Sequence, residues 1–284
     1  MIKNNLVAIG NINSNITQVN IEGLTKEEVQ ELCLKLVDEL MARLRADAAE
    51  VFKSQVYEFV ELFFQRLADI AGSHDVLNKL KTPAVQFALD EALLIYGKHP
   101  TLEEKEMQVE LLIDKIQTND NSTKGIIIDA ARFELCNLTN AQISLLAFLS
   151  ICALECESSD KKALFEFFQK HGALLGDIQS MEKVDYAYLQ HTNCLHQISF
   201  IDNADFIEKN LFGKYAERTG ASTEEEFKSY LNTTSPLWSS VLDKIKVNNM
   251  ACYKPTAVGF YIGLKRLEKT FGLELDFEGL YVGY

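Results

Sequence analysis

Residues 138–152 read LTNAQISLLAFLSIC, a helix start followed by an almost unbroken apolar segment. Thr139 and Gln142 have the spacing of a capping box, in which each side chain accepts a hydrogen bond from the other residue's backbone N–H. Leu138 and Ile143 can form the flanking hydrophobic contact. A helix that is apolar on every side must be enclosed by other elements. This stretch therefore predicts a central helix in a helical domain.

Similar capping and proline signals predict further helices on both sides of this stretch. They start at Thr82–Pro83, Thr101–Glu104, Ser222–Glu226, Ser235–Pro236 and Lys254–Thr256. The last of these helices is expected to end at Gly272. Residues 125–135 favour a helix over a buried strand. The tail after Gly272 alternates Leu273, Leu275 and Phe277, which is typical of an extended strand.

A long amphipathic helix is predicted towards the N-terminus. Thr25 and Glu28 form another capping box, and the apolar stripe that follows continues to Ile70. An unbroken helix over this range would have about 46 residues and a length near 69 Å. A break near Asp47 is the alternative, because Asp is a weak helix former that suits an N-cap.

The opening segment, residues 8–21, reads AIGNINSNITQVNI and carries no charge and no proline. Its alternating apolar residues favour short strands, with a turn at residues 13–15. Three interpretations stay open: pairing with another copy, docking on the body of the same chain, and a disordered tail. Pairing is favoured, because an uncharged β-prone segment beside an exposed apolar stripe is an aggregation hazard unless both are paired.

Oligomerisation is therefore predicted to use both the N-terminal segment and the start of the long helix. The predicted contact residues are Val7, Ile9, Ile12, Ile16, Val19, Ile21, Val29, Leu36 and Leu40.

The predicted fold is mainly α: a multi-helix body preceded by the long amphipathic helix and a short N-terminal β segment. Four regions are expected. Residues 1–24 form the β-prone segment, 25–72 the long helix, 73–158 a helical domain and 159–284 a C-terminal helical domain. The polar stretch at residues 157–160 marks the last boundary.

Composition excludes several classes of partner. The chain has 284 residues, of which 47% are hydrophobic and 24% charged, and its net charge is −13. With no local basic patch, this charge disfavours nucleic acid and anionic membranes. No apolar run approaches the ~20 residues of a membrane-spanning helix, so no membrane insertion is expected. Six dispersed cysteines and the lack of an export signal predict reduced thiols in the cytoplasm.

No established catalytic or cofactor motif is present, and no metal or cofactor is predicted. Cys152 and Cys156, with His191, Cys194 and His196, contain metal-ligand types but fit no zinc spacing. An enzyme site in residues 176–220 is kept as an alternative. Its candidate residues are His191, Asn193, His196, Asp202 and Asp205. Two further patterns favour core packing: the pair Gly259 and Gly263, and the aromatic row around Phe59 and Phe63.

The order of these features resembles an uncharacterised bacterial family of mostly helical proteins. The resemblance rests on LTKEEVQELCLKL (24–36), TPAVQFALDEA (82–92), LCNLTNAQISLLA (135–147) and PTAVGFYIGLKRL (255–267), together with the Asn/Ile-rich opening segment. It implies no activity and no catalytic residue. The opening segment is also similar to those of bacterial proteins associated with phage conflict, which implies an assembly role.

The sequence thus predicts a cytoplasmic protein that assembles with itself, senses a signal or binds a partner protein through its helical body, and acts in bacterial defence. The alternatives are an enzyme of unknown class and a monomeric helical adaptor.

Overall fold

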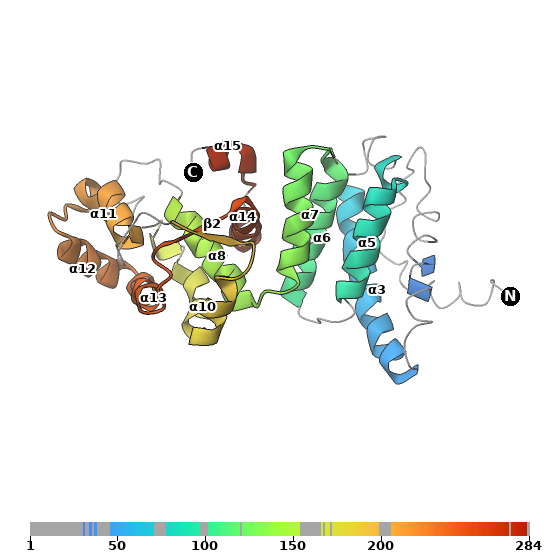
Figure 1. The fold of residues 1–284 in the computed structure, drawn as a ribbon, viewed down its shortest axis with the longest axis horizontal. Helices are drawn as coiled ribbons and strands as arrows, with labels where there is room; N and C mark the ends of the chain where they lie inside the picture. Colours follow the sequence, from blue (N-terminus) through green and yellow to red (C-terminus); the bar gives the residue numbers. More distant parts are fainter. Residues whose placement is uncertain are drawn as a thin grey trace. The chain divides into compact units, whose positions relative to one another are not determined.

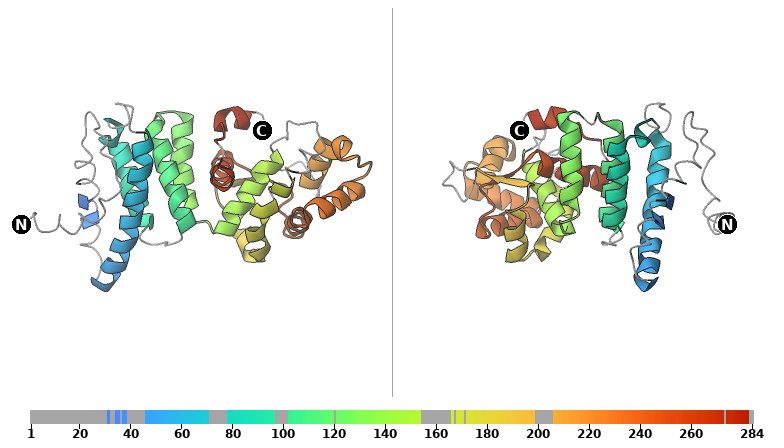
Figure 2. Two further views of the ribbon diagram at one scale, coloured as in Figure 1. Left: turned by 180° about the vertical axis from the view of Figure 1, so that it is seen from behind. Right: turned by 45° about the vertical axis from the view of Figure 1, so that its right-hand side comes forward.

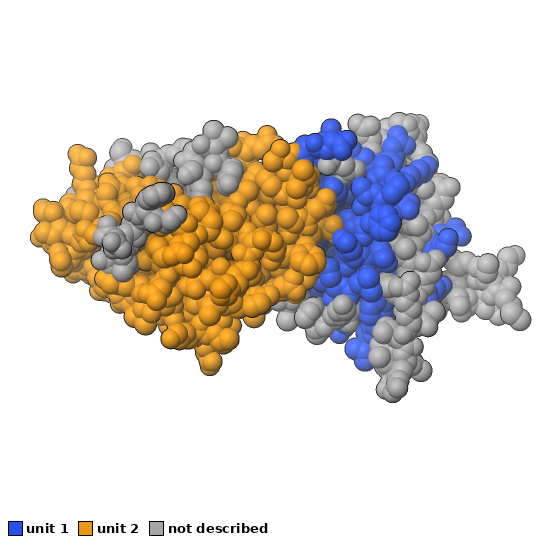
Figure 3. Space-filling model, viewed as in Figure 1, with its two compact units in different colours: residues 1–122 blue, residues 123–284 orange. Residues whose placement is uncertain are grey.

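The fold is mainly α, as predicted, with one small two-stranded sheet (Figure 1). The computed structural model describes residues 31, 34, 35, 37, 38, 46–70, 78–96, 102–119, 121–153, 166, 168–170, 172–198, 206–272 and 274–282. The chain forms two compact units, residues 1–122 and residues 123–284, shown in blue and orange in Figure 3. Among the described residues, no helix has both the length and the apolar composition that crossing a bilayer requires.

Unit 1 contains three packed helices, α3 (Ala46–Ile70), α5 (Pro83–Tyr96) and α6 (Leu102–Gln117), each in contact with the other two (Figure 1). The aromatic row on α3 lies in the core, as predicted, because Phe59 and Phe63 are fully buried. The ring of Phe59 meets the ring of Tyr96 edge-on at 4.5 Å between centroids. This arrangement buries large apolar area in the geometry that aromatic pairs prefer.

The unbroken helix of about 46 residues is not observed. Helix α3 begins at Ala46, next to the break considered at Asp47. The described residues between 31 and 38 lie beside α3 and are not collinear with it (Figures 1 and 2). One of them, Val37, is buried in the same apolar core as α3. The apolar stripe is therefore divided between two segments.

Unit 2 is built around α8 (Asn140–Ala153), the helix predicted to be central. Its side chains from Ile143 to Cys152 are all buried. It packs against α14 (Ala257–Phe271), the 3-10 helix η2 (Ala173–Ser180) and α10 (Lys183–Leu189). Helix α7 (Thr123–Leu135) packs on α14, and α13 (Pro236–Val247) packs on η2. Helices α11 (Phe206–Thr219) and α12 (Glu224–Thr234) complete the layer beyond α13.

The predicted helix signals in unit 2 are confirmed. Thr139 and Gln142 exchange the two hydrogen bonds of a capping box. Thr223 and Thr256 cap α12 and α14 with their side chains. Gly272 ends α14 in the left-handed conformation, with a φ of 61° that favours glycine.

The small sheet pairs β1 (Leu195–Gln197) with β2 (Tyr253–Pro255) in antiparallel register, with His196 opposite Lys254. The prediction of an extended tail was wrong at Phe277, because residues Phe277–Val282 form the helix α15. Phe277 is buried against the rings of Tyr261 and Phe260 on α14. A short helix can direct the Phe277 ring onto α14 just as a strand at this position could.

The boundary between the two compact units lies between Ser122 and Thr123 in the sequence, so α7 and α8 belong with the C-terminal helices. The boundary predicted after residue 158 falls in residues 154–165, outside the described residues. It stays a prediction, as do the predicted β segment at residues 1–24 and the capping boxes at residues 25 and 101.

Candidate interaction surfaces

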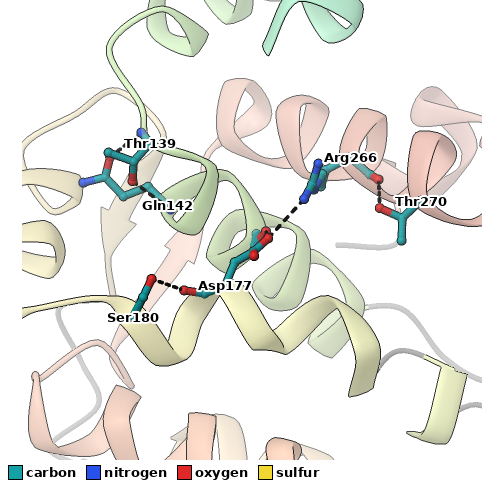
Figure 4. Close-up of polar contacts among 7 residues, drawn as sticks. Thr139, Gln142, Asp177, Ser180, Arg266 and Thr270 are labelled. Atoms are coloured by element: carbon teal, nitrogen blue, oxygen red, sulfur yellow. Dashed lines mark hydrogen bonds and ion pairs between the residues drawn. The ribbon is translucent and has the colours of Figure 1, made fainter. Parts of the chain in front are cut away.

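A polar joint holds the centre of unit 2 together. Asp177 on η2 points towards Arg266 on α14, and its Oδ2 accepts a hydrogen bond from Arg266 Nη2 at 3.1 Å (Figure 4). The same oxygen accepts a hydrogen bond from Ser144 Oγ on α8 at 3.0 Å. The Arg266 side chain is 8% exposed, whereas that of Asp177 is 48% exposed. The carboxylate therefore neutralises a buried cation from the surface and ties three helices together.

A second joint connects the start of α8 to α10. The Gln142 side chain, already part of the capping box, donates from Nε2 to the carbonyl oxygen of Asp185 at 3.0 Å. Both joints use their polar groups to fix neighbouring helices.

Three residues of the predicted enzyme site are described, and all three are exposed. His191 and Asn193 lie in the turn between α10 and β1, and His196 lies in β1. The side-chain Nδ2 of Asn193 donates to Glu134 Oε1 on α7 at 2.7 Å, and the backbone carbonyl oxygen of Asn193 accepts from Thr256 Oγ1 at 2.5 Å. Asn193 thus connects α7 to the start of α14. The other two candidates, at positions 202 and 205, lie outside the described residues.

The described cysteines are free thiols in different environments. Cys152 and Cys194 are buried, and burial raises the pKa of both, that of Cys194 to about 12. Both are therefore neutral near pH 7, whereas metal ligation and nucleophilic attack need the thiolate. Within the described residues, no group of three or more His, Cys, Asp or Glu side chains is placed to hold a metal ion. Cys156 lies outside that part of the chain.

The outer face of α7 carries an apolar stripe that sequence reasoning missed. Ile126 is 63% exposed and Phe133 is 68% exposed. They are seven residues apart, so they lie on one side of the helix, with Ala130 between them. We call these three residues the α7 stripe. The signal was present in the run of three isoleucines at 126–128, because three consecutive helical residues cannot all face one core.

Other exposed apolar side chains are more isolated. Val184 and Tyr188 form a pair one turn apart on α10, while Phe87 on α5 is 70% exposed and Val247 at the end of α13 is 80% exposed. Single exposed apolar residues are ordinary on protein surfaces. The α7 stripe differs from the α10 pair because it extends over two turns of one helix face, from Ile126 to Phe133.

None of the residues predicted for oligomerisation, from Val7 to Leu40, lies among the described residues. Their role stays a prediction.

A protein-family model described as ":-like" matches residues 23–218, which is more than half of the chain. The chain belongs to this family. The match begins after the Asn/Ile-rich segment and ends within α11. Neither the curated proteins nor the solved structures gave a match. The resemblance to a family over most of the chain is confirmed to this extent, and the bacterial origin stays a prediction.

Proposed function

We propose that this protein assembles with copies of itself and that the assembled helical body senses a signal by binding a partner protein. The observation that carries the proposal is the α7 stripe. Ile126 and Phe133 present apolar area to solvent on a helix whose other face is buried in unit 2. Aligned exposed apolar residues mark surfaces that become buried on association.

The N-terminal segment supports the same proposal from the sequence. Residues 8–21 carry no charge, whereas the whole chain has a net charge of −13. Copies of an acidic protein repel one another, so contacts between them are expected where charge is lowest. The N-terminal segment is such a place. A cytoplasmic location and a role in bacterial defence belong to the proposal as well, and rest on the sequence alone.

The polar residues of the α10–β1 turn give less support to the enzyme alternative. Asn193 and Glu134 bind each other, and Cys194 beside them is a buried neutral thiol. These groups act in the packing of α7, α14 and β1.

The proposal is tested by measuring absolute mass with light scattering. We expect the full chain to be an oligomer and the double variant Ile126→Ser, Phe133→Ser to form a smaller species. The matched control is Phe87→Ser with Val247→Ser, which removes two comparably exposed apolar side chains that are not aligned. The control should keep the mass of the unmodified chain.

Emission from Trp238 shows whether each variant keeps its fold, because it is the single tryptophan and is fully buried in unit 2. A full chain that is a monomer at every concentration would overturn the proposal. If the control variant lost as much mass as the α7 variant, the α7 stripe would not be the contact that holds the assembly together.

A further inference from the structure

The sheet β1–β2 has two edges that differ in their hydrogen-bonding capacity. The antiparallel register pairs Leu195 with Pro255 and Gln197 with Tyr253. Flanking backbone bonds join Thr256 N to Cys194 O at 2.9 Å and Ile198 N to Cys252 O at 2.8 Å. In an antiparallel ladder, hydrogen-bonded and non-hydrogen-bonded pairs alternate. The backbone groups of Leu195, Gln197, Tyr253 and Pro255 therefore point away from the partner strand.

The outer edge of β2 offers no free donor. Pro255 has no backbone N–H, and the N–H of Tyr253 is bound to the carbonyl oxygen of Met250 at 3.0 Å. Proline and local pairing are the usual ways in which proteins block an edge strand.

The outer edge of β1 is open by comparison. Gln197 is exposed, and among the described residues its outward N–H has no backbone partner. The outward N–H of Leu195 has none there either, but Leu195 is 6% exposed, so Gln197 is the accessible position of this edge. The edge itself carries no charged side chain at these two positions. It has the features of an acceptor for an added strand, in which main-chain hydrogen bonds provide the contact.

We propose that the open edge of β1, at Leu195 and Gln197, binds the Asn/Ile-rich N-terminal segment of a second copy of this chain. This inference rests on the proposed self-assembly and assigns one of its contacts. The segment is suited to the edge because it is β-prone and uncharged, in a chain whose net charge of −13 disfavours contacts between charged surfaces. Residues 22–30, which connect the segment to the described part of the chain, span about 30 Å when fully extended, and this length lets the segment reach beyond its own chain.

The contact has a consequence for the type of assembly. Segment and edge are different surfaces, so the interaction is heterologous, and each copy gives one segment and receives another. Such contacts close into rings or continue as open chains. Pairing of two N-terminal segments with each other would instead give a symmetric dimer.

The first test compares two substitutions at one position in the full chain. Gln197→Pro removes the outward N–H but leaves the β1–β2 ladder intact, because the pair with Tyr253 does not use that group. Gln197→Thr keeps the N–H and is the matched control. We expect Gln197→Pro to reduce the mass of the assembly at least twofold and Gln197→Thr to leave it unchanged, with Trp238 emission the same in both.

The second test mixes two full chains that each lack one half of the contact. One carries Gln197→Pro, and the other carries Ile9→Pro with Ile12→Pro, which interrupts both faces of the segment. Both also carry Ile126→Ser and Phe133→Ser, so that the α7 stripe contributes nothing. Sedimentation should show each chain alone as a monomer and the mixture as a 1:1 complex that grows no further.

The outcomes separate this inference from the proposed function. If the unmodified chain assembles but Gln197→Pro assembles equally well, or the mixture forms no complex, the edge of β1 is not the binding site and self-assembly stands. If the unmodified chain is a monomer, both fail. A monomer in which the Gln197 amide exchanges slowly would show that the segment docks on its own chain, which also overturns the second copy as occupant.

Discussion

Units 1 and 2 are both helical, but they use polar groups in different ways. In unit 1, ion pairs connect neighbouring helices beside an apolar core: Lys105 to Glu58 at 2.6 Å and Arg66 to Glu110 at 2.7 Å. In unit 2, polar groups lie between the helices, as Asp177 does when it joins α8, η2 and α14. In unit 1 these polar contacts thus join helices in pairs, whereas in unit 2 a single carboxylate joins three helices.

Close backbone contact limits substitution at the centre of unit 2. A Cβ atom added at Gly259 would lie 1.9 Å from the carbonyl oxygen of Cys194, and one added at Gly263 would lie 2.7 Å from that of Leu146. Helix α14 therefore meets α8 and the residue before β1 directly through its backbone. Side chains can rearrange after a substitution more easily than two backbones can separate. Substitutions of these two glycines should consequently cost unit 2 more stability than substitutions of its exposed side chains.

The largest expected effect is that of Gly259→Ala. The new methyl group would overlap the Cys194 carbonyl, so unit 2 should lose more than about 4 kcal/mol of unfolding free energy. The measurement is denaturant unfolding followed by Trp238 emission. Gly213→Ala on α11 is the control, since nothing lies within 4 Å of its added Cβ. It should stabilise by roughly 0.5–1 kcal/mol.

Alkaline pH should weaken unit 2 through Cys194. Burial is the main cause that raises the pKa of this thiol from 9.0 to about 12. A hydrogen bond with Thr192 lowers the pKa, and the nearby charge of Glu134 raises it by a smaller amount. The folded state keeps the thiol neutral, so this stability is complete below pH 9 and is lost between about pH 9 and pH 12. Between pH 8 and about pH 11, the unfolding free energy of the unmodified chain should fall by on the order of 3 kcal/mol more than that of the Cys194→Ala variant. Parallel losses in the two chains would contradict the expectation.

Unit 1 has its own sensitive point at Lys105. Its side chain is buried, and Nζ lies 5.0 Å from the centroid of the Tyr96 ring. Glu58→Ala would leave the buried ammonium without its carboxylate, at a cost of about 2 kcal/mol. Asp69→Ala removes only a 4.0 Å ion pair between exposed side chains and should cost less than about 0.5 kcal/mol. Hydrogen exchange in α6 measures both, and equal protection in the two variants would show that the burial of Lys105 is unimportant.

The smallest effect compares a helix cap in each unit. Thr139→Ala removes the 3.3 Å bond that Gln142 N donates to Thr139 Oγ1, leaves the backbone bond from Thr139 N to Gln142 Oε1 in place, and should cost about 1 kcal/mol. At the start of α5, Thr82 Oγ1 accepts a longer bond, 3.5 Å, from Val85 N and donates a 2.7 Å bond to the carbonyl oxygen of Lys79. Because its capping bond is the longer one, Thr82→Ala should cost about 0.5 kcal/mol. Thermal unfolding of the two variants measures the difference. If the order were reversed, the bond that Thr82 donates to Lys79 would contribute more than the side-chain cap at Thr139.

Local features of the fold were predictable from the sequence because they depend on residues close together in the chain. The capping box at Thr139 and Gln142, the cap at Thr256 and the glycine end at Gly272 each lie within a few residues. The all-round apolar pattern of α8 also identified the centre of unit 2 correctly. These signals predict where helices start, stop and become enclosed.

Features that depend on distant residues were not predictable. Asp177 and Arg266 are 89 residues apart in sequence, and nothing local pairs them. The strands β1 and β2 have three residues each, too few to show an alternating pattern. The alternation of apolar residues up to Phe277 predicted a strand, but alternation over so few residues also occurs by chance in a short helix. Ile126 is exposed because the opposite face of α7 packs on α14. The sequence of α7 alone does not show which face that is.

Helix α14 lies outside the segment, residues 23–218, that defines the family. Yet α8, which lies inside that segment, depends on α14 for cover along one side. Natural selection should therefore preserve the close packing of α14 on α8, and should constrain the other residues of α14 less strictly. Related proteins are expected to diverge freely across their last quarter while keeping two small residues four apart in the covering helix. Glycines with open surroundings, such as Gly213, should drift over the same evolutionary distance.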